Sequence, residues 1–194
     1  MTAPTTAHPL PRKFFERPTE TVGRELLGKL IIRAGAPQRV ARIVEVEAYL
    51  GERDQASHAR RGPTPRAAIM FGPPGHLYVY LVYGMHHCMN VVTESDGTAG
   101  AVLLRAAEPL SGFEGGGSPL RGPGRLCRGL GVTRNDNGLD LCRGRDLWLA
   151  SDGSAAPRIK RSARIGVAYA GAWANRLLRF YVPGNAHVSG RPRD

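Results

Sequence analysis

Glu45, Glu47 and Tyr49 alternate with apolar residues in the segment VARIVEVEAYL (40–50). Successive side chains of a β-strand point to opposite faces, so one face of this strand would carry two carboxylates and a phenol. A carboxylate in that position can accept a proton from water or stabilise a developing positive charge. The pattern by itself favours a simpler interpretation, in which these residues form the solvent-exposed face of a half-buried strand.

Polar aromatic residues gather between positions 49 and 87 of the chain. They are Tyr49, His58, Tyr78, Tyr80, Tyr83, His86 and His87. Flat rings can stack on nucleobases, which contributes about 1–3 kcal/mol per base in single-strand binders. The run LYVYLVY is also typical of an ordinary β-strand, because tyrosine has a high strand propensity, and this favours a structural role for Tyr78. Tyr83 lies at a predicted hairpin tip, where a core residue is not expected.

The chain carries a large excess of positive charge. It contains 27 Lys and Arg against 16 Asp and Glu, a formal net charge of +11, and nearly all the basic residues are arginine. The planar guanidinium group suits phosphate. A GC-rich genome would explain arginine in place of lysine but not the surplus of charge. The composition therefore predicts a polyanionic partner bound to the folded surface.

Several classes of protein are excluded. The three cysteines, Cys88, Cys127 and Cys142, fit neither a disulfide framework nor a zinc site and are expected as free thiols in a reducing compartment. The N-terminus lacks the apolar region of a secretory signal, and no stretch approaches ~18 apolar residues. We expect a cytoplasmic protein with no membrane partner.

A metal site is not expected either. Residues 86–88 read His-His-Cys, but adjacent strand residues point to opposite faces and no fourth ligand is evident. The H-x-E and P-C-x-x-C signature of the zinc deaminases is absent, which excludes that class of base-acting enzyme. No cofactor is expected.

The chain of 194 residues predicts one domain over residues 13–194, preceded by a flexible segment at 1–12. The patterns predict an α+β fold with a mostly antiparallel β-sheet and few, short surrounding helices. Helices are expected at 19–27, between Thr64 and Gly72, and from Pro123 to near Gly131. Residues 83–87 form a hairpin tip, and 111–124 form a flexible surface loop. Strands are expected at 30–33, 40–50, 77–82, 88–93, 101–105, 147–150, 165–169 and 178–182.

Several long segments, in order, resemble the alkyladenine (3-methyladenine) DNA glycosylase family. They are RIVEVEAYLG, DQASHA, TPRAAIMFGPPGHLYVYLVYGMHHCMNVV, AVLLRAAEPL, GPGRLCRGLG and ARIGVAYAGAWANRLLRFYVPG, and the similarity runs from about Arg12 to Ser189. The resemblance implies a monofunctional hydrolase of base-excision repair with a protruding hairpin that wedges into DNA. Its partner would be double-stranded DNA containing alkylated or deaminated purines, and its product an abasic site. A lyase step needs an amine nucleophile, and the three lysines lie outside the matching pocket segments.

The same resemblance assigns the catalytic roles. Glu47 matches the general base that activates a water for attack on the sugar C1′, through a transition state like that of glycoside hydrolysis. Arg105 matches an arginine near that water and the adjacent phosphate, whose charge keeps Glu47 ionised.

The base pocket follows from the same match. Tyr49 would stack on one face of the flipped base, and His58 and Tyr80 would form the other side. Asn90 matches the residue that crowds the exocyclic amine of guanine, and Leu103 lines the same pocket.

The DNA contacts come from two segments. Tyr83 would wedge into the duplex from the minor groove and fill the gap left by the flipped nucleotide, with Met85 beside it. Gly122, Gly124 and Arg125 match a phosphate-contacting segment, where backbone amides face outward at the positive end of a helix dipole.

One alternative stays open on sequence alone. A non-catalytic nucleic-acid-binding module would explain the charge and the aromatic residues, and would reduce Glu47 and Arg105 to a surface salt bridge, which is common and contributes little. The family resemblance implies a pocket that fits 3-methyladenine, 7-methylguanine, hypoxanthine and ethenoadenine. One wedge and one pocket require only a monomer.

Overall fold

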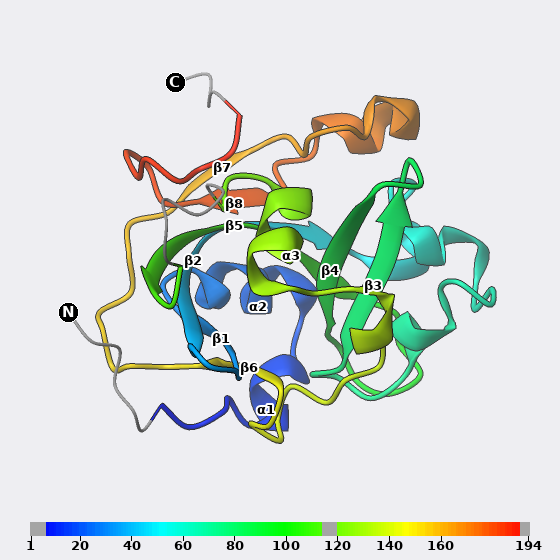
Figure 1. Ribbon diagram of the computed structural model, residues 1–194. Helices are drawn as coiled ribbons and strands as arrows, with labels where there is room; N and C mark the ends of the chain where they lie inside the picture. Colours follow the sequence, from blue (N-terminus) through cyan, green and yellow to red (C-terminus); the bar gives the residue numbers. More distant parts are fainter. Residues whose placement is uncertain (1–6, 114–119, 191–194) are drawn as a thin grey trace.

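The computed structural model describes residues 7–113 and 120–190 (Figure 1). Within these residues a curled sheet of eight strands follows the order β3-β4-β5-β2-β1-β6, with β8 paired to β2 and β7 to β8. All pairings between named strands are antiparallel. The strands are β1 (Leu30–Arg33), β2 (Arg39–Tyr49), β3 (Leu77–Val82), β4 (His86–Val92), β5 (Ala101–Ser111), β6 (Leu147–Ala150), β7 (Lys160–Ser162) and β8 (Arg179–Tyr181). The expected α+β class and antiparallel sheet are confirmed.

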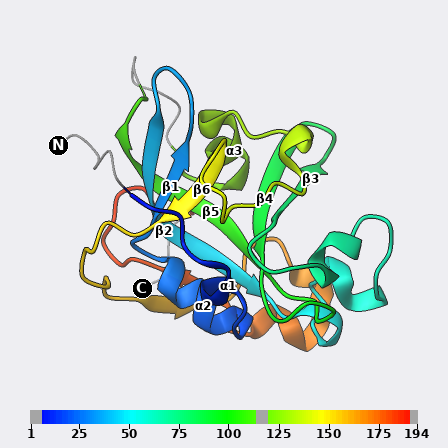
Figure 2. The same ribbon diagram turned by 90° about the horizontal axis from the view of Figure 1, so that it is seen from below.

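The helices are short and pack closely on this sheet. Figure 2 shows α1 and α2 next to each other; α2 packs against β2 and β5, and α3 packs against β4 and β5. The helices are α1 (Arg12–Phe15), α2 (Thr19–Leu26) and α3 (Pro123–Leu130), and the 3-10 helices are η1 (Gly51–Arg53), η2 (His58–Arg61), η3 (Ala68–Phe71), η4 (Arg134–Asp136) and η5 (Ala168–Asn175). None of the helices in the described part of the chain is long and apolar enough to cross a membrane.

The main core lies on one face of the sheet. Val46 and Ala48 of β2 and Leu104 of β5 are buried there with Val22 and Leu26 of α2. Val22 and Leu26 are four residues apart and so lie on one side of the helix. Because strand side chains alternate, the residues between these core positions point to the opposite face of the sheet, and that face carries the candidate site.

Several expected boundaries were wrong. The strand predicted at 101–105 continues to Ser111, because β5 keeps pairing with β2 past Pro109, beside an irregularity in the pairing at Val40 and Ala41. The strand predicted to begin at Cys88 begins at His86, which pairs with Val82. The predicted hairpin tip therefore shortens to residues 83–85.

Two further segments differ from expectation. The strand expected at 165–169 does not form, because Ile165 donates its amide to Glu47 and Gly166 adopts a positive φ of 78°. The helix framed by Thr64 and Gly72 is a 3-10 helix that begins only at Ala68. The sequence patterns also missed α1, β7, η1, η2, η4 and η5.

Two segments expected to be flexible fall partly outside the described residues, at 1–6 and 114–119. In their described parts, Pro9 forms a bridge with Ala150 and Leu10 is buried. Leu120 is also buried, and its carbonyl accepts the amide of Ala107 in β5.

Candidate active site

The register of the sheet aligns the candidate site residues in one row. Tyr78 of β3 lies opposite Asn90 of β4, which lies opposite Leu103 of β5. Leu103 in turn lies opposite Glu47 of β2, and Glu47 lies opposite Arg179 of β8. Directly opposed residues of antiparallel strands point to the same face. Five strands therefore present one continuous row of side chains on the face away from the main core.

Arg105 lies on the same face, two residues after Leu103, and a β-bulge lies at its position. Glu45 pairs with Ala106 and Val46 with Leu104, which leaves Arg105 as the extra residue of β5. A bulge bends its strand and can redirect a side chain. Here the Arg105 guanidinium contacts both Glu45 and Glu47, at 3.0 and 3.2 Å. Burial opposes the charge of Arg105, but the two carboxylates outweigh that effect and raise its pKa.

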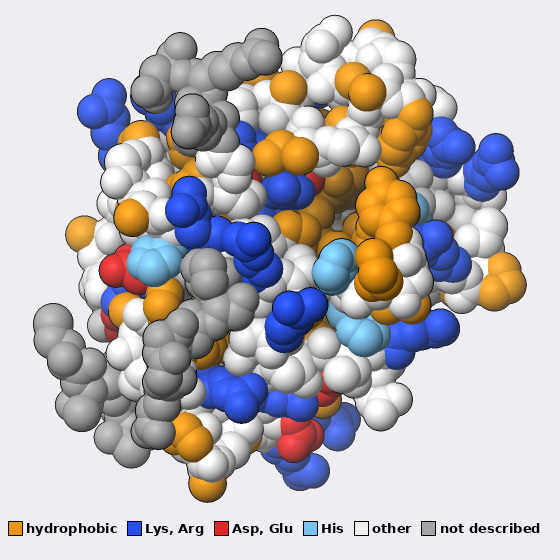
Figure 3. Space-filling view, turned by 45° about the horizontal axis from the view of Figure 1, so that its top comes forward, with side chains coloured by type: hydrophobic (Ala, Val, Ile, Leu, Met, Phe, Trp, Pro, Cys, Tyr) orange, Lys and Arg blue, Asp and Glu red, His pale blue; other side chains and the backbone are white. Residues whose placement is uncertain are grey.

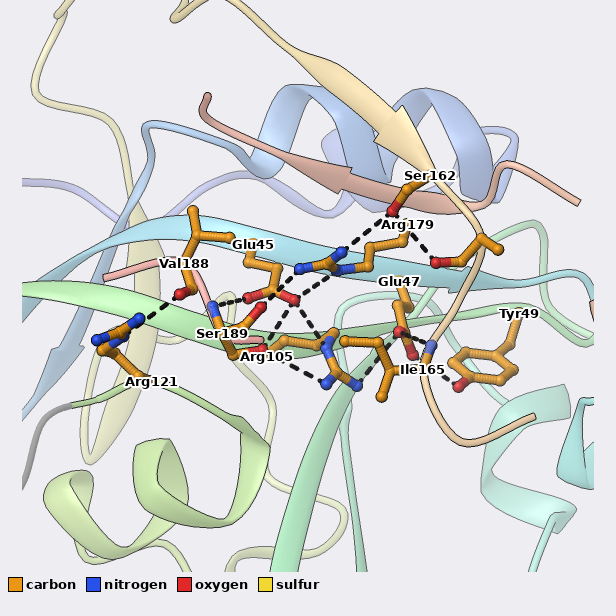
Figure 4. A network of polar contacts seen from close by, with 11 residues as sticks. Glu45, Glu47, Tyr49, Arg105, Arg121, Ser162, Ile165, Arg179, Val188 and Ser189 are labelled. Carbon is orange, nitrogen blue, oxygen red and sulfur yellow. Dashed lines mark hydrogen bonds and ion pairs between the residues drawn. The ribbon is translucent and has the colours of Figure 1, made fainter. Parts of the chain in front are cut away.

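Glu47 is fully buried and held by three donors (Figure 4). One carboxylate oxygen accepts the backbone amide of Ile165 at 2.7 Å and faces Arg105. The other accepts the hydroxyl of Tyr49 at 2.8 Å. Burial, followed by the negative charge of Glu47, raises the pKa of Tyr49 well above 10.0. Tyr49 therefore keeps its proton and remains a donor.

The interpretation of this face as solvent-exposed was wrong, because Glu45 and Glu47 are both 0% exposed. Strands β5 and β8 flank this part of β2 on its two edges. Glu45 accepts hydrogen bonds from Arg179 at 2.7 Å and from the Ser189 hydroxyl at 2.9 Å, in addition to Arg105. The segments that supply these partners lie far apart in sequence, so alternation alone could not predict that they cover the strand.

A cavity of about 420 Å³ opens beside this network, within the usual range of ligand pockets. All five residues predicted for a base pocket line it: Tyr49, His58, Tyr80, Asn90 and Leu103. Arg105 also lines it, whereas Glu47 lies behind its own contacts Tyr49, Arg105 and Ile165. The structure thus brings together the predicted catalytic and pocket residues.

Aromatic rings form one wall of the cavity. The His58 ring lies 4.6 Å from that of Tyr80 and edge-on to it, and the His58 Nδ1 lies 2.9 Å from the hydroxyl of Tyr78. Burial, followed by the nearby charges of Arg66 and Arg60, lowers the pKa of His58 to about 4. Neutral imidazole is therefore the form present at physiological pH. The sequence favoured a purely structural role for Tyr78. The residue is buried, but it also lies in this wall of the cavity.

Asn90 lies deep in the cavity and is held in place. Its side-chain amide donates to the carbonyl of Tyr78 at 3.1 Å, and the residue is 4% exposed. Leu103 is also almost completely buried beside it. Both residues come from central strands of the sheet, so the inner end of the cavity is rigid.

The tip of the β3–β4 hairpin is exposed and strained. Tyr83 is 89% and Met85 71% exposed. Tyr83 and Gly84 both have positive φ, 51° and 69°, and the amide of Met85 donates to the carbonyl of Val82. A left-handed conformation costs about 1–2 kcal/mol for a residue with a Cβ atom, and such strain is concentrated at functional sites. A tyrosine kept in this conformation without packing indicates a role outside the folded core.

A basic groove of about 510 Å³ runs between this hairpin and the start of α3. The predicted phosphate-binding residues Gly122, Gly124 and Arg125 line it, whereas none of them lines the aromatic cavity. Arg121 and Arg128 add two further guanidinium groups. Tyr83 and Pro123 border both the groove and the cavity, so the two hollows are neighbours.

Arginines also surround the other side of the cavity mouth. Arg60, Arg61 and Arg66 line a third hollow next to His58, and the Arg66 guanidinium lies over the ring of Tyr80 at 5.0 Å. Figure 3 shows the hollow between hydrophobic side chains, with blue Lys and Arg side chains on the surface around it. The site thus combines an aromatic cavity with a cationic surround.

Sequence reasoning missed the residues that support the site. The segment 163–178 was expected as part strand, so the contacts of Arg164 with Asp54 and of Ile165 with Glu47 could not be predicted. Alternation in β8 does place Arg179 and Tyr181 on one face, which was a usable signal. Ser189, near the end of the matched segments, carried none.

The arrangement has the parts required for hydrolysis at a charged or electron-poor centre. A carboxylate with fixed donors can accept a proton from water and face a cationic transition state. The aromatic wall suits a flat, π-rich substrate, and the arginine surround suits a polyanion. Among the described residues, no group of three or more His, Cys, Asp and Glu could hold a metal ion.

Comparisons with known proteins agree with this chemistry. A family model described as Methylpurine-DNA glycosylase (MPG) matches residues 13–186. A protein of Anaeromyxobacter dehalogenans (strain 2CP-1) named "Putative 3-methyladenine DNA glycosylase" is 54% identical over 185 residues, covering 94% of this chain and 86% of that protein. Proteins of the same name from Myxococcus xanthus and Methanocella arvoryzae are each 50% identical, covering 94% of this chain and 94% and 96% of their own lengths.

Proposed function

The chain belongs to the methylpurine-DNA glycosylase family, whose members hydrolyse N-glycosyl bonds, and we propose that it removes damaged purines from duplex DNA by flipping them into the aromatic cavity. The observation that carries the proposal is Glu47, a fully buried carboxylate with fixed donors beside that cavity. The product is an abasic site, and the substrate is an alkylated or deaminated purine.

Glu47 acts as the general base. It takes a proton from a water that attacks the sugar C1′, and its negative charge faces the oxocarbenium-like transition state. Arg105, which contacts Glu47 and lines the cavity, supports this role by orienting the carboxylate and by meeting the phosphate beside the flipped nucleotide. An alkylated purine is cationic and leaves as a neutral base, so little acid assistance is needed.

The base stacks between Tyr49 on one side and His58 and Tyr80 on the other. Neutral His58 supports the binding of cationic purines, because a protonated ring would repel them. Asn90 excludes normal guanine by crowding its exocyclic amine, and Leu103 limits the depth of the cavity. The immobilised Asn90 amide and the burial of both residues support this role.

The hairpin tip enters the DNA where the base has left. Tyr83 fills the gap in the stack, and Met85 lies beside it. The phosphates of the duplex follow the groove that Gly122, Gly124 and Arg125 line on one side of the tip. One hairpin and one cavity in a single chain support a monomeric enzyme.

The alternative of a non-catalytic DNA-binding module required Glu47 and Arg105 to be a surface ion pair. Their side chains are 0% and 8% exposed. Burial of such charges costs several kcal/mol per ion, which binding to DNA alone would not explain. The buried network therefore favours the enzyme.

The test is single-turnover release of hypoxanthine from an inosine-containing duplex, with wild type compared against Glu47→Gln. We expect the variant to bind the duplex but to lose at least about 100-fold in rate, the usual contribution of a general base. Glu108→Gln is a matched control on β5, because Glu108 bonds to Asn185 away from the cavity; it should keep the wild-type rate.

Hypoxanthine is one of several fitting substrates, so a wild type that releases none is tested once more on methylated DNA. Binding without release from either duplex would contradict the glycosylase proposal. A Glu47→Gln variant at the wild-type rate would remove Glu47 from the mechanism while leaving the activity in place.

A further inference from the structure

We propose that the buried ion pair between Asp54 and Arg164 is a positioning device, which holds the ring of Tyr49 and the amide of Ile165 in place around Glu47. This inference rests on the proposed function of Glu47 and Tyr49. Neither Asp54 nor Arg164 lines the cavity, so both act through other residues.

The pair is closed to solvent and geometrically fixed. The Arg164 guanidinium makes two hydrogen bonds to the two oxygens of Asp54, and both side chains are 0% exposed. Asp54 also accepts the backbone amides of Leu50 and Ala56, each at 3.0 Å. The carboxylate is thereby anchored to the turn that directly follows β2, which carries Glu47.

Arg164 supports the ring of Tyr49. Its guanidinium carbon lies 4.6 Å from the ring centroid, and its Nη1 donates to the carbonyl of Ala48 at 2.9 Å. A cation–π contact is stronger when it is shielded from solvent, as it is here. Because Tyr49 lines the cavity and Arg164 does not, the guanidinium supports the ring from the side away from the cavity. The cavity side remains available to a base.

Arg164 also fixes the next residue in the chain. The amide of Ile165 donates to Glu47 at 2.7 Å, and Gly166 turns the chain away immediately afterwards with a φ of 78°. Strand β7 ends at Ser162, so no sheet hydrogen bonds hold this amide. One ion pair thus sets two of the three donors to Glu47, the Tyr49 hydroxyl and the Ile165 amide.

Stability alone does not explain why the pair is buried. Replacing a buried ion pair by apolar residues of similar volume is often neutral or stabilising. A planar, bidentate guanidinium differs from an apolar side chain in the accuracy with which it positions its neighbours. Here those neighbours are the stacking platform and the general base.

The experiment uses the double variant Asp54→Asn/Arg164→Met, since removing one charge alone would leave the other buried and unpaired. Single-turnover base release should slow by about 100-fold, the cost of a misplacement near 1 Å. Affinity for undamaged duplex should not change. A fluorescent ethenoadenine in the duplex reports stacking, and its emission change on binding should be smaller than with wild type. Arg164→Lys, which keeps the charge but not the planar face, should fall between wild type and the double variant in base-release rate and in emission change.

Arg42→Met/Asp152→Asn is the matched control, because Arg42 also bonds to a carboxylate and to a backbone carbonyl but lies outside the cavity. It should keep the wild-type rate and emission. A double variant at Asp54 and Arg164 with the wild-type rate and emission would overturn the inference, as would an equal loss in the control. Failure of the proposed function is a different result, namely a wild type that releases no base.

Discussion

The negative charge of Glu47 is balanced by neighbouring charged side chains rather than by solvent. The buried cluster contains the carboxylates of Glu45, Glu47 and Asp54 and the guanidinium groups of Arg105, Arg164 and Arg179. The formal charges cancel, which reduces the cost of excluding water from the group. Each carboxylate has several donors, so the proposed general base cannot rotate freely. This rigidity is the form of preorganisation that makes electrostatic catalysis effective in a dry site.

His58 is the residue whose charge state should be set most clearly by the fold. Its pKa is lowered to about 4, whereas an unfolded histidine titrates near 6.5. Between these two values the unfolded state binds more protons, so the stability that neutral His58 contributes above pH 6.5 is lost as the pH falls toward 4. His58→Gln should therefore lose less stability than wild type over that range in urea unfolding.

The same residue can be observed directly. We expect the His58 ring signal in an NMR titration to stay constant from pH 8 to 5 and to move only near pH 4. A histidine in an unfolded chain, which titrates near 6.5, provides the comparison. A His58 signal that titrates near 6.5 would show that the ring is solvated and available for protonation during catalysis.

At the scale of elements, the β3–β4 hairpin should separate stability from function. Tyr83 is almost fully exposed and left-handed, and asparagine tolerates that conformation better than tyrosine. Tyr83→Asn should leave the melting temperature unchanged or slightly raised, yet release a lesion-containing duplex at least about 5-fold faster, since a stacked ring contributes about 1–3 kcal/mol. Melting curves and dissociation rates measure the two effects.

Leu177→Asn is the control for this prediction, because Leu177 is another exposed apolar residue, 51% accessible, outside the cavity lining. It should change neither quantity much. A large drop in melting temperature for Tyr83→Asn would mean that the tyrosine packs against the protein and does not enter DNA.

The strands and the loops differ in how far the sequence predicts them. Alternation placed Glu45 and Glu47 on one face of β2 and Leu103 and Arg105 on one face of β5, because the strand period is a local property. The bulge at Arg105, which shifts the pairing of β5 with β2, left no signal in the pattern. The burial of Glu45 depends on Ser189, 144 positions later in the chain, and no local rule could supply that contact.

In the loop containing Ile165, the local sequence pattern predicted a strand that does not form. Its apolar residues match a strand pattern, but its hydrogen bonds go to side chains of the site. The family resemblance matched this segment without indicating its conformation. The strand preference of these residues is overridden here by a tertiary contact, the buried Asp54–Arg164 pair.

At the scale of the whole molecule, positive charge is concentrated where DNA would pass. Arg121, Arg125 and Arg128 line the groove on one side of the hairpin tip, and Arg60, Arg61 and Arg66 line the hollow next to His58. Such a distribution attracts the duplex before any base is recognised. The net charge of +11 can therefore favour DNA binding through the surface, although the buried charges of the site cancel one another.

Phosphate neutralisation releases counterions, so affinity for undamaged duplex should fall steeply with salt, with a slope of about −0.9 for each phosphate contacted. Arg125→Gln should reduce that slope by about 1 and weaken damaged and undamaged duplex by the same factor. Arg143→Gln is the matched control, because Arg143 is also exposed but pairs with Asp140 away from the groove. Fluorescence anisotropy over a salt series measures both slopes. Equal slopes for wild type and Arg125→Gln would remove the groove from the DNA path, and a loss confined to damaged duplex would place Arg125 in lesion recognition instead.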